Sequence, residues 1–369
     1  MILIRHVFLI SLAACSADRP SLNLAYESPA DDATSFKCTT SLEKTRDWLN
    51  TDRFIETRRE VFKVKEEELV PSFSIDSLSK TKSLLLGLRN IRDDELILLC
   101  PLKNLEILYL NNDGSPNSLT GKTLHHLSSL QKLKFLDLDA NKIPASEIWR
   151  LKGLSNLEEL RLYLNPIGEN GYENFLALKS LKILLLQAVG LSMKSQPSFS
   201  RLSAHETLED LYVGDNELSD EFLKVFVNFK HLKKLGFANN SLKGTGLKNL
   251  SALENLTSIS IGVLSYPDFT KVDPTFDIAS LDLLKSLPNL SVLGLRGVKI
   301  DEASFISGFK NLKDLKELYL FENLQLTNEE LRVFLDYKNL KVLRLNDAVK
   351  VKCEKSIIQI RAKFPGIKI

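Results

Sequence analysis

Asp137, Asp139 and Asn141 place three oxygen-bearing side chains two residues apart. Oxygen ligands at this spacing open a calcium-binding loop, which also needs glycine at its sixth position and glutamate at its twelfth. This chain has Lys142 and Ile148 at those two positions. The sequence therefore predicts a local negative patch here and no metal site.

Other residue types that could do chemistry lack their partners. His125 and His126 are adjacent, so on a helix they point about 100° apart and cannot share a metal as a pair four residues apart can. Gly244-Thr-Gly246 lacks the third glycine of a phosphate-binding turn. The chain contains neither G-x-S-x-G nor Cys-x-x-Cys. We therefore expect no enzyme activity, no cofactor and no metal.

A repeated unit dominates the rest of the chain. Residues 133–141 read L-x-x-L-x-L-x-x-N, in which Leu136 and Leu138 alternate with polar or variable neighbours as in a strand with one buried side. We count eleven copies whose first paired apolar residues are Leu86, Leu108, Leu136, Leu160, Leu184, Leu211, Leu235, Ile259, Leu293, Leu318 and Leu343. The steps are 22, 28, 24, 24, 27, 24, 24, 34, 25 and 25 residues.

This pattern and its period resemble those of leucine-rich-repeat proteins over about 81–350. The resemblance implies an α/β fold: a curved, horseshoe-shaped solenoid of about eleven repeats with a parallel sheet on the concave side and helices on the convex side. It also implies that asparagines such as Asn141 hydrogen-bond loop backbone in a ladder. Several copies lack that asparagine and must satisfy their loops otherwise; they have Asp113, Val189, Leu264, Val298 and Ala348.

The segments between strands show apolar residues with helical spacing. We expect amphipathic helices over 220–227, 303–309 and 328–335, with Asp220 and Asn328 as N-caps.

The residues that point outward from the strands are the candidates for binding. Copies six to nine are rich in small residues, and aromatic residues flank them. A partner could lie close to the backbone there, and tyrosine, phenylalanine and arginine are common in binding hot spots. The predicted partner-binding residues are Tyr163, Tyr212, Gly236, Ser260, Gly294, Arg296, Tyr319 and Phe321. The alternative is that the glycines only relieve crowding on a curved face. The insertion at 264–278 is a second candidate surface.

The N-terminal segment reads as an export signal. A basic n-region with Arg5 and an apolar stretch precede Leu12-Ala-Ala-Cys15, which resembles a bacterial lipobox. The resemblance implies cleavage of a signal peptide over 1–14 and attachment of fatty acyl chains, such as palmitate, to Cys15. Because Ser16 is not aspartate, the resemblance favours the outer membrane. Residues 15–37 would form a lipidated tether.

Two caps are expected. Segment 38–80 would be the N-terminal cap, with a helix at 41–49 and a strand at 61–65, and Trp48, Leu49 and Phe54 would cover the first repeat. Segment 351–369 would close the C-terminal end with a helix, a Pro-Gly turn and a strand.

The remaining cysteines are Cys38, Cys100 and Cys353. Cys38 and Cys353 belong to opposite ends of the solenoid, so the disulfide to be considered is Cys38–Cys100. A free, buried thiol at Cys100 is the alternative.

The charge balance bounds the partners. The 49 Lys and Arg residues nearly balance the 47 Asp and Glu residues, whereas a nucleic-acid binder usually carries a basic excess. We therefore expect a lipid-anchored, monomeric scaffold of the bacterial cell envelope that binds a protein through its concave face, without catalysis. The alternative is recognition of envelope carbohydrate, such as peptidoglycan or lipopolysaccharide.

Overall fold

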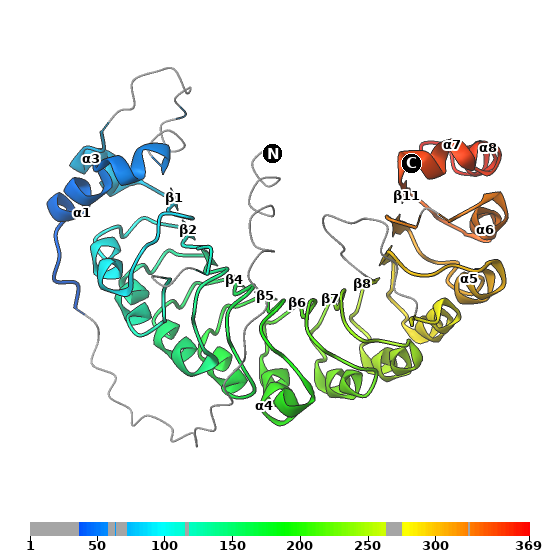
Figure 1. The fold of residues 1–369 in the computed structure, drawn as a ribbon, viewed down its shortest axis with the longest axis horizontal. Coiled ribbons are helices and arrows are strands. Elements are labelled where there is room, and N and C mark those ends of the chain that lie inside the picture. The colour runs from blue at the N-terminus through cyan, green and yellow to red at the C-terminus, as the bar shows by residue number, and fades with distance from the viewer. Residues whose placement is uncertain (1–36, 58–62, 64–71, 115–117, 263–274, 324) are drawn as a thin grey trace. The chain divides into compact units, whose positions relative to one another are not determined.

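The computed structural model describes residues 37–57, 63, 72–114, 118–262, 275–323 and 325–369 (Figure 1). These residues form two compact units. The first contains the described part of 1–143 together with 150–156, and the second contains 144–149 together with the described part of 157–369. Within these ranges, no helix is both long and apolar enough to cross a bilayer.

Each unit carries short parallel strands that follow one another in chain order. The strands of the first unit are β1 (Ser83–Leu85), β2 (Ile107–Tyr109) and β3 (Phe135–Asp137). Those of the second are β4 (Glu159–Arg161), β5 (Ile183–Leu185), β6 (Asp210–Tyr212), β7 (Lys234–Gly236), β8 (Ser258–Gly262), β9 (Val292–Arg296), β10 (Glu317–Leu320) and β11 (Val342–Leu345).

The strand register aligns the leucines of successive repeats. Within the second unit, Leu184 pairs with Leu160 on one side and Leu211 on the other, and this row continues through Leu343. The row is fully buried, since its members are at most 1% exposed. Alternation along each strand therefore sends the intervening residues to the opposite face of the sheet.

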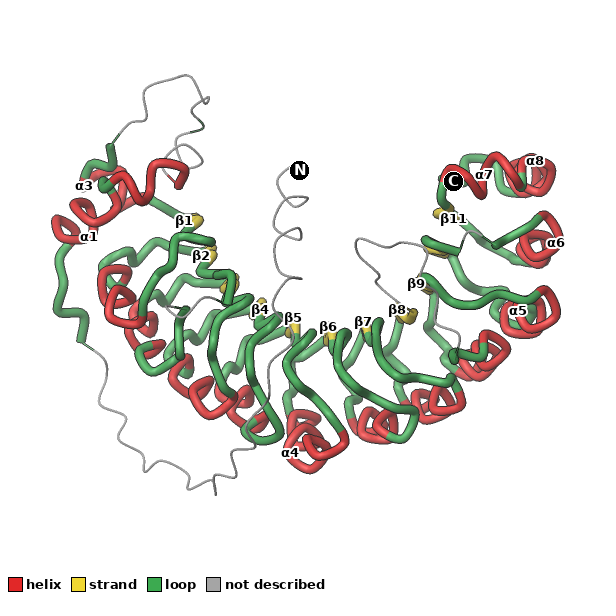
Figure 2. The backbone as a smooth tube through the Cα atoms, viewed as in Figure 1, coloured by secondary structure: helices red, strands yellow, loops and turns green. Residues whose placement is uncertain are grey.

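Helical segments connect the strands, and in the second unit they lie on the outer side of the repeats (Figure 2). The α-helices are α1 (Leu42–Leu49), α3 (Ile75–Lys80), α4 (Gln196–Arg201), α5 (Glu302–Phe309), α6 (Asn328–Leu331), α7 (Asp347–Lys352) and α8 (Glu354–Lys363). The 3₁₀ segments are η3 (Asp52–Phe54), η4 (Asp93–Leu99), η5 (Leu124–Ser129), η6 (Ala145–Leu151), η7 (Tyr172–Ala177), η8 (Met193–Ser195), η9 (Leu202–Ala204), η10 (Phe222–Asn228), η11 (Thr245–Ala252), η12 (Ile278–Ser286) and η13 (Arg332–Asp336).

The 3₁₀ form follows from an apolar period of three. Leu247, Leu250 and Leu253 are all buried, and a helix with three residues per turn places all of them on one side. The helix expected at 220–227 is present as the 3₁₀ segment η10, which begins at Phe222. The expected helix at 303–309 is confirmed by α5, whereas only the first turn of 328–335 is α-helical.

Both expected N-caps are wrong. The Asp220 carboxylate accepts hydrogen bonds from Gly244 N at 3.1 Å and Thr245 Oγ1 at 2.7 Å in the next repeat. The N-cap of α6 is Thr327, one residue before Asn328. Asn328 instead accepts a bond from Ser356 N at 2.9 Å and so supports the C-terminal helices.

Asparagines at the strand ends form the expected ladder. The Asn216 Nδ2 atom donates to Val213 O at 3.0 Å in its own repeat and to Leu186 O at 2.9 Å in the preceding one. Its Oδ1 atom accepts from Val189 N at 3.1 Å and Leu191 N at 3.0 Å. The loop that lacks its own asparagine is therefore satisfied by the asparagine of the following repeat.

Other copies use the same arrangement. Asn323 Oδ1 accepts from Val298 N at 3.1 Å, so the loop with valine at the asparagine position is again served from the next repeat. Asn141 donates to Leu110 O at 3.0 Å and accepts from Leu119 N at 3.0 Å. Each of these three asparagines reaches backward along the chain by one repeat.

The expected register of the first copy is wrong by two residues. Leu84, rather than Leu86, pairs with Leu108. Leu88, expected in the core, is 40% exposed and has a left-handed φ of 59°. With Leu84 as its first paired residue, this copy lies 24 residues before the next one, the commonest step in the chain.

The N-terminal cap packs onto the first repeat. The helix expected at 41–49 is α1, with Ser41 as its N-cap, and Leu49 and Phe54 are fully buried. Trp48 Nε1 donates to Glu95 Oε1 at 3.1 Å. The strand expected at 61–65 lies almost wholly outside the described residues.

A disulfide joins Cys38 to Cys100, with the Cα atoms 5.7 Å apart, and this is the first of the two alternatives that the sequence left open. At the other end, Cys353 is free and buried. The helix there is α8, and the chain then turns at Gly366 and pairs Lys368 with Val342. The preceding helix, α7, was not expected.

Candidate functional site

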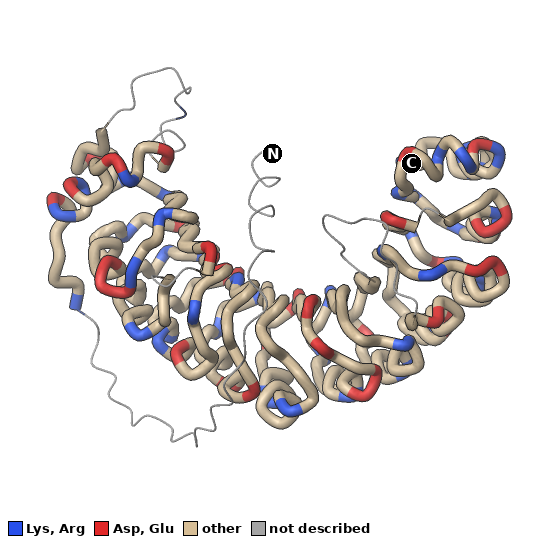
Figure 3. The backbone as a smooth tube through the Cα atoms, in the orientation of Figure 1, with Lys and Arg blue, Asp and Glu red and all other residues tan. Residues whose placement is uncertain are grey.

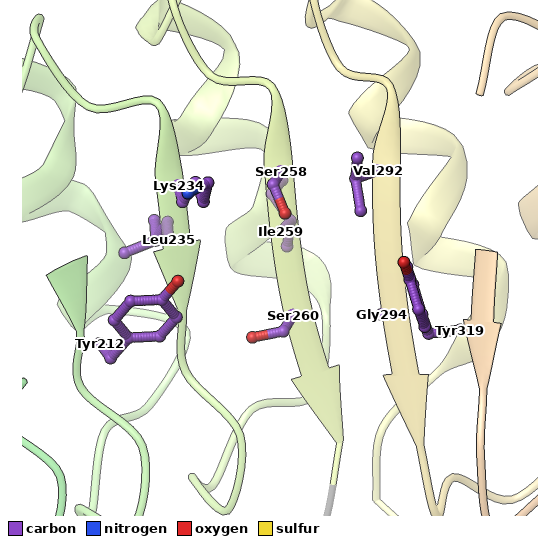
Figure 4. Close-up of a pocket in the computed structure, with 9 residues that line it drawn as sticks. All are labelled: Tyr212, Lys234, Leu235, Ser258, Ile259, Ser260, Val292, Gly294 and Tyr319. Carbon is purple, nitrogen blue, oxygen red and sulfur yellow. The ribbon is translucent and has the colours of Figure 1, made fainter. Parts of the chain in front are cut away.

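The inner face of the second unit contains a hollow of about 270 Å³, which we call the trough (Figure 4). It is lined by Tyr212, Lys234, Leu235, Ser258, Ile259, Ser260, Val292, Gly294 and Tyr319. These residues come from five neighbouring strands, β6 to β10. Four of the eight predicted binding residues therefore lie around one hollow.

One register row forms the middle of the trough. Tyr212, Gly236, Ser260, Gly294 and Tyr319 are neighbours across the five strands. Adjacent strands lie about 4.8 Å apart, so the backbones of the two tyrosines are separated by roughly 19 Å along the sheet. The row thus places two large rings at its ends and small residues between them.

Gly236 accommodates the ring of Tyr212. A Cβ atom at Gly236 would lie 2.6 Å from Tyr212 Cδ1 and 2.9 Å from Ser260 Oγ, closer than such atoms can approach. Gly236 is buried and is not among the lining residues. Gly236 therefore lies beneath the Tyr212 ring and not in an open floor. This agrees with the alternative that the glycine relieves crowding.

Gly294 is the open part of the row. A Cβ atom there would meet Ser260 Cβ at 3.4 Å, which is an ordinary contact. In Figure 4 the Tyr212 ring is seen broadside, whereas the Tyr319 ring is seen edge-on beside Gly294. The accessible space therefore lies over Ser260 and Gly294, between the Tyr212 ring and the Tyr319 ring.

The charged groups near the trough are engaged by neighbouring side chains. Lys234 Nζ lies 2.7 Å from Asp210 Oδ2, and this hydrogen bond raises the pKa of Lys234. Tyr319 OH donates to Glu317 Oε2 at 2.8 Å, which raises the pKa of the phenol. Burial raises the pKa of Tyr212 as well. At neutral pH both phenols are protonated, and the one cation of the lining, Lys234, is neutralised by its neighbour.

Three hydroxyl groups stand in the trough. Those of Tyr212, Ser258 and Ser260 make no hydrogen bond to another described residue. A hydroxyl group can both donate and accept. The trough therefore offers hydrogen bonds without offering a net charge.

The other predicted residues lie outside the lining. Arg296 forms an ion pair with Glu322, which is only 5% exposed, so its charge is already engaged. Phe321 is 38% exposed, and its ring centroid lies 6.3 Å from that of Tyr319, at the margin of the trough. Tyr163 is half-buried just beyond β4. Cys15 lies outside the described residues.

Most of the insertion at 264–278 also lies outside the described residues, which resume at Thr275. Its described part includes Phe276, which is 3% exposed and so packs into the body of the second unit.

Sequence reasoning missed one row of the lining. Lys234, Ser258 and Val292 stand two residues before Gly236, Ser260 and Gly294. The period of two along a strand sends both rows to the same face, so the signal was available. The predicted residues stand one or three positions after the first paired apolar residue of each copy, whereas this row stands one position before it.

The site has the composition of a binding surface. Among the described residues, no group of three or more His, Cys, Asp or Glu side chains could hold a metal ion. The acidic groups beside the trough are engaged, by Lys234 in one case and by Tyr319 in the other. What the trough provides is apolar area, aromatic rings and hydroxyl groups.

Three observations together decide the fold family. Parallel strands recur mostly every 24 or 25 residues, helical segments return on the far side of the sheet, and strand-end asparagines bond loops of the preceding repeat. The chain folds as a leucine-rich-repeat solenoid. Its repeats run from β1 to β11.

Comparison with known proteins agrees with a leucine-rich-repeat chain. Podocan-like protein 1 of Mus musculus is 30% identical over 131 residues, which are 35% of this chain and 22% of that protein. CD180 antigen of Mus musculus is 29% identical over 136 residues, which are 37% of this chain and 20% of that protein. The chain thus spans about a fifth of the length of the curated relatives it matches. No family model matches the chain.

Two solved structures from Listeria monocytogenes are similar to this leucine-rich-repeat chain. One internalin is 20% identical, with 85% of this chain and 95% of that chain covered and a TM-score of 0.46. Internalin C2 is 18% identical, with 73% and 92% covered and a TM-score of 0.39.

Proposed function

We propose that this protein is a membrane-anchored leucine-rich-repeat scaffold that binds another protein through the trough and does not act as a catalyst. The observation that carries the proposal is the register row in which Tyr212 and Tyr319 flank Ser260 and Gly294. The strand backbones there bond one another, so a partner would meet side chains and carbon surface. Aromatic residues of this kind anchor many protein interfaces.

The electrostatics of the second unit support a protein partner. Acidic and basic residues are interspersed along it (Figure 3), and the cation of the trough lining, Lys234, is paired with Asp210. A polyanion such as nucleic acid would need a field of one sign. A folded protein surface, with its mixture of apolar and polar groups, fits such a face.

The anchor is proposed from the sequence Leu12-Ala-Ala-Cys15. Acyl chains on Cys15 would hold the repeats at the bacterial envelope, with the outer membrane favoured, because two or more chains give stable attachment. Incorporation of labelled palmitate into the wild type, and its loss in Cys15→Ser, would support this. Equal labelling of both proteins would contradict it.

The second candidate is recognition of envelope carbohydrate. The observation that favours it is the combination of the Tyr212 ring with the Ser258 and Ser260 hydroxyl groups, which make no hydrogen bond to another described residue. Sugars stack on aromatic rings and bond to hydroxyl groups. Capture that survives protease treatment of the target would favour this candidate over a protein partner.

A crosslinking pull-down from envelope fractions and from neighbouring-cell lysates tests the proposal. The bait is the form beginning at Ser16, compared with a Tyr212→Ala/Tyr319→Ala double variant of unchanged circular dichroism. Tyr163→Ala is the matched control, because Tyr163 lies outside the trough. We expect a protein captured by the wild type and the control but not by the double variant. Equal capture by all three would refute the trough as the site.

A further inference from the structure

The trough constrains which chemical group of a partner it can hold. Given the proposed function, in which a protein binds at this face, the trough limits which side chain of that protein can be inserted.

The first constraint is size. The hollow has a volume of about 270 Å³ and lies between the Tyr212 ring and the Tyr319 ring. It lies just below the range of about 300–1,000 Å³ that pockets for drug-sized ligands usually span. One large side chain fits it, whereas a helix or a folded loop does not.

The second constraint is polarity. The floor consists of the strand backbone at Leu235, Ile259 and Gly294 together with the Val292 side chain. The side chains of Leu235 and Ile259 belong to the buried row on the other face of the sheet. A charged side chain placed on this floor would lose its hydration, so its burial would be unfavourable. Lys234 is already paired with Asp210, and the Glu317 carboxylate already accepts a hydrogen bond from Tyr319. An apolar side chain gains in proportion to the area that it removes from water.

The third constraint comes from the hydroxyl groups. Ser258 and Ser260 stand on β8 in the middle of the trough and make no hydrogen bond to another described residue. A side chain that enters the hollow brings its own peptide group to the rim. The N–H and C=O of that peptide group can be satisfied by these two hydroxyls.

We propose that the trough binds one bulky apolar side chain of the partner, of the size of Leu, Ile, Met, Phe or Trp. The side chain lies over Gly294 between Tyr212 and Tyr319, and the adjoining peptide group hydrogen-bonds to Ser258 and Ser260. The trough is thus a pocket for one anchor residue, and the rest of the partner lies on the surrounding strands.

A peptide library displayed on phage tests this directly. The full chain in mild detergent is panned against random twelve-residue peptides, and the binding of each enriched peptide is then measured to the wild type and to the Gly294→Leu variant. Leucine at Gly294 would occupy the hollow, whereas Gly294→Ala is the matched control because its Cβ would make an ordinary contact with Ser260. Circular dichroism and thermal unfolding establish that both variants are folded.

We expect the enriched peptides to share one bulky apolar position. Replacing that residue by alanine should weaken binding on the order of 10- to 100-fold, as the loss of one buried side chain implies. Binding should fall similarly for Gly294→Leu and change little for Gly294→Ala. The alanine scan is made on the peptide, so it reads out the anchor even if Gly294→Leu does not fold.

Three results would overturn the inference. They are an enriched motif that is acidic or basic, peptides that bind Gly294→Leu as well as the wild type, and no enrichment of any peptide. The Tyr212→Ala/Tyr319→Ala variant separates this failure from that of the proposed function. Peptides that lose binding to the double variant but not to Gly294→Leu place the partner on this face without an anchor residue, whereas peptides indifferent to both variants place it elsewhere.

Discussion

Replacing Asn216 by alanine should strongly destabilise the second unit. Its side chain accepts hydrogen bonds from the amides of Val189 and Leu191 and donates to the carbonyls of Leu186 and Val213. Asn216 is only 7% exposed, so water does not replace these bonds readily. Each buried polar group left without a partner costs about 1–3 kcal/mol. Counting the two amides alone, we expect a loss of roughly 2–6 kcal/mol.

Asn255→Ala is the matched control for this prediction. Asn255 is exposed and also bonds the preceding repeat, through a single hydrogen bond of 2.8 Å to Lys230 O. An exposed bond of this kind contributes about 1 kcal/mol or less.

The assay is urea unfolding at 25 °C, followed by circular dichroism, with both variants and the wild type measured side by side. If Asn216→Ala lost no more stability than Asn255→Ala, the reasoning that the ladder supports the loops would be refuted.

Three further predictions concern titration and thiols. Burial raises the pKa of Asp215 although Asn239 Nδ2 donates a hydrogen bond to it at 2.6 Å. Ionisation of Asp215 therefore opposes folding, and Asp215→Asn should raise the melting temperature at pH 7. This gain should shrink to nothing as the pH falls below the ordinary aspartate pKa. An equal gain at pH 3 would contradict this. Cys38→Ser should lower the stability of the first unit by about 4 kcal/mol, the entropy model's value for a loop of this length, and reductant should then affect only the wild type in equilibrium unfolding. Cys353 is buried, and burial raises the pKa of its thiol. In the form beginning at Ser16, Cys353 should therefore resist iodoacetamide at pH 8 until guanidinium unfolds the chain. Rapid labelling of the native form, detected by mass spectrometry, would contradict the burial of this thiol.

The repeat architecture was predictable because the same short sequence pattern recurs along the chain. A leucine alternation followed by asparagine is repeated often enough that most strands could be placed to within a residue. The first copy failed because leucines stand at 84, 86 and 88, and alternation alone allows either pair to face the core. The step to the next copy distinguishes them, since only Leu84 gives a spacing of 24.

The form of the connecting helices needed a finer reading of the same residues. Spacings of three and four both suggest a helix, but Leu247, Leu250 and Leu253 keep strictly to three. A short connection within a repeat of about 24 residues also favours the tighter helix with its longer rise per residue. The N-caps were misplaced for a related reason, because Asp220 serves the neighbouring repeat and that contact is not local in sequence.

The candidate site could be predicted in part. Alternation places Tyr212, Ser260, Gly294 and Tyr319 on one face, and register then makes them neighbours. The sequence could not show that the Tyr212 ring covers the glycine beside it, since that depends on a side-chain rotamer. Nor could it show that Arg296 is engaged by a glutamate 26 residues later, because such pairing is set by the loop conformation.

The asparagine ladder makes each repeat depend on its successor. Asn216 completes the loop that contains Val189, and Asn323 completes the loop that contains Val298, whereas these bonds do not run the other way. Shortening the second unit from its C-terminal end would therefore expose unbonded amides in the last remaining loop. Shortening it from the N-terminal end would remove a loop and its hydrogen bonds to the next asparagine together, so no loop amide would lose its acceptor. The array thus has a direction, and its loss of structure on progressive deletion should be steeper from one end than from the other.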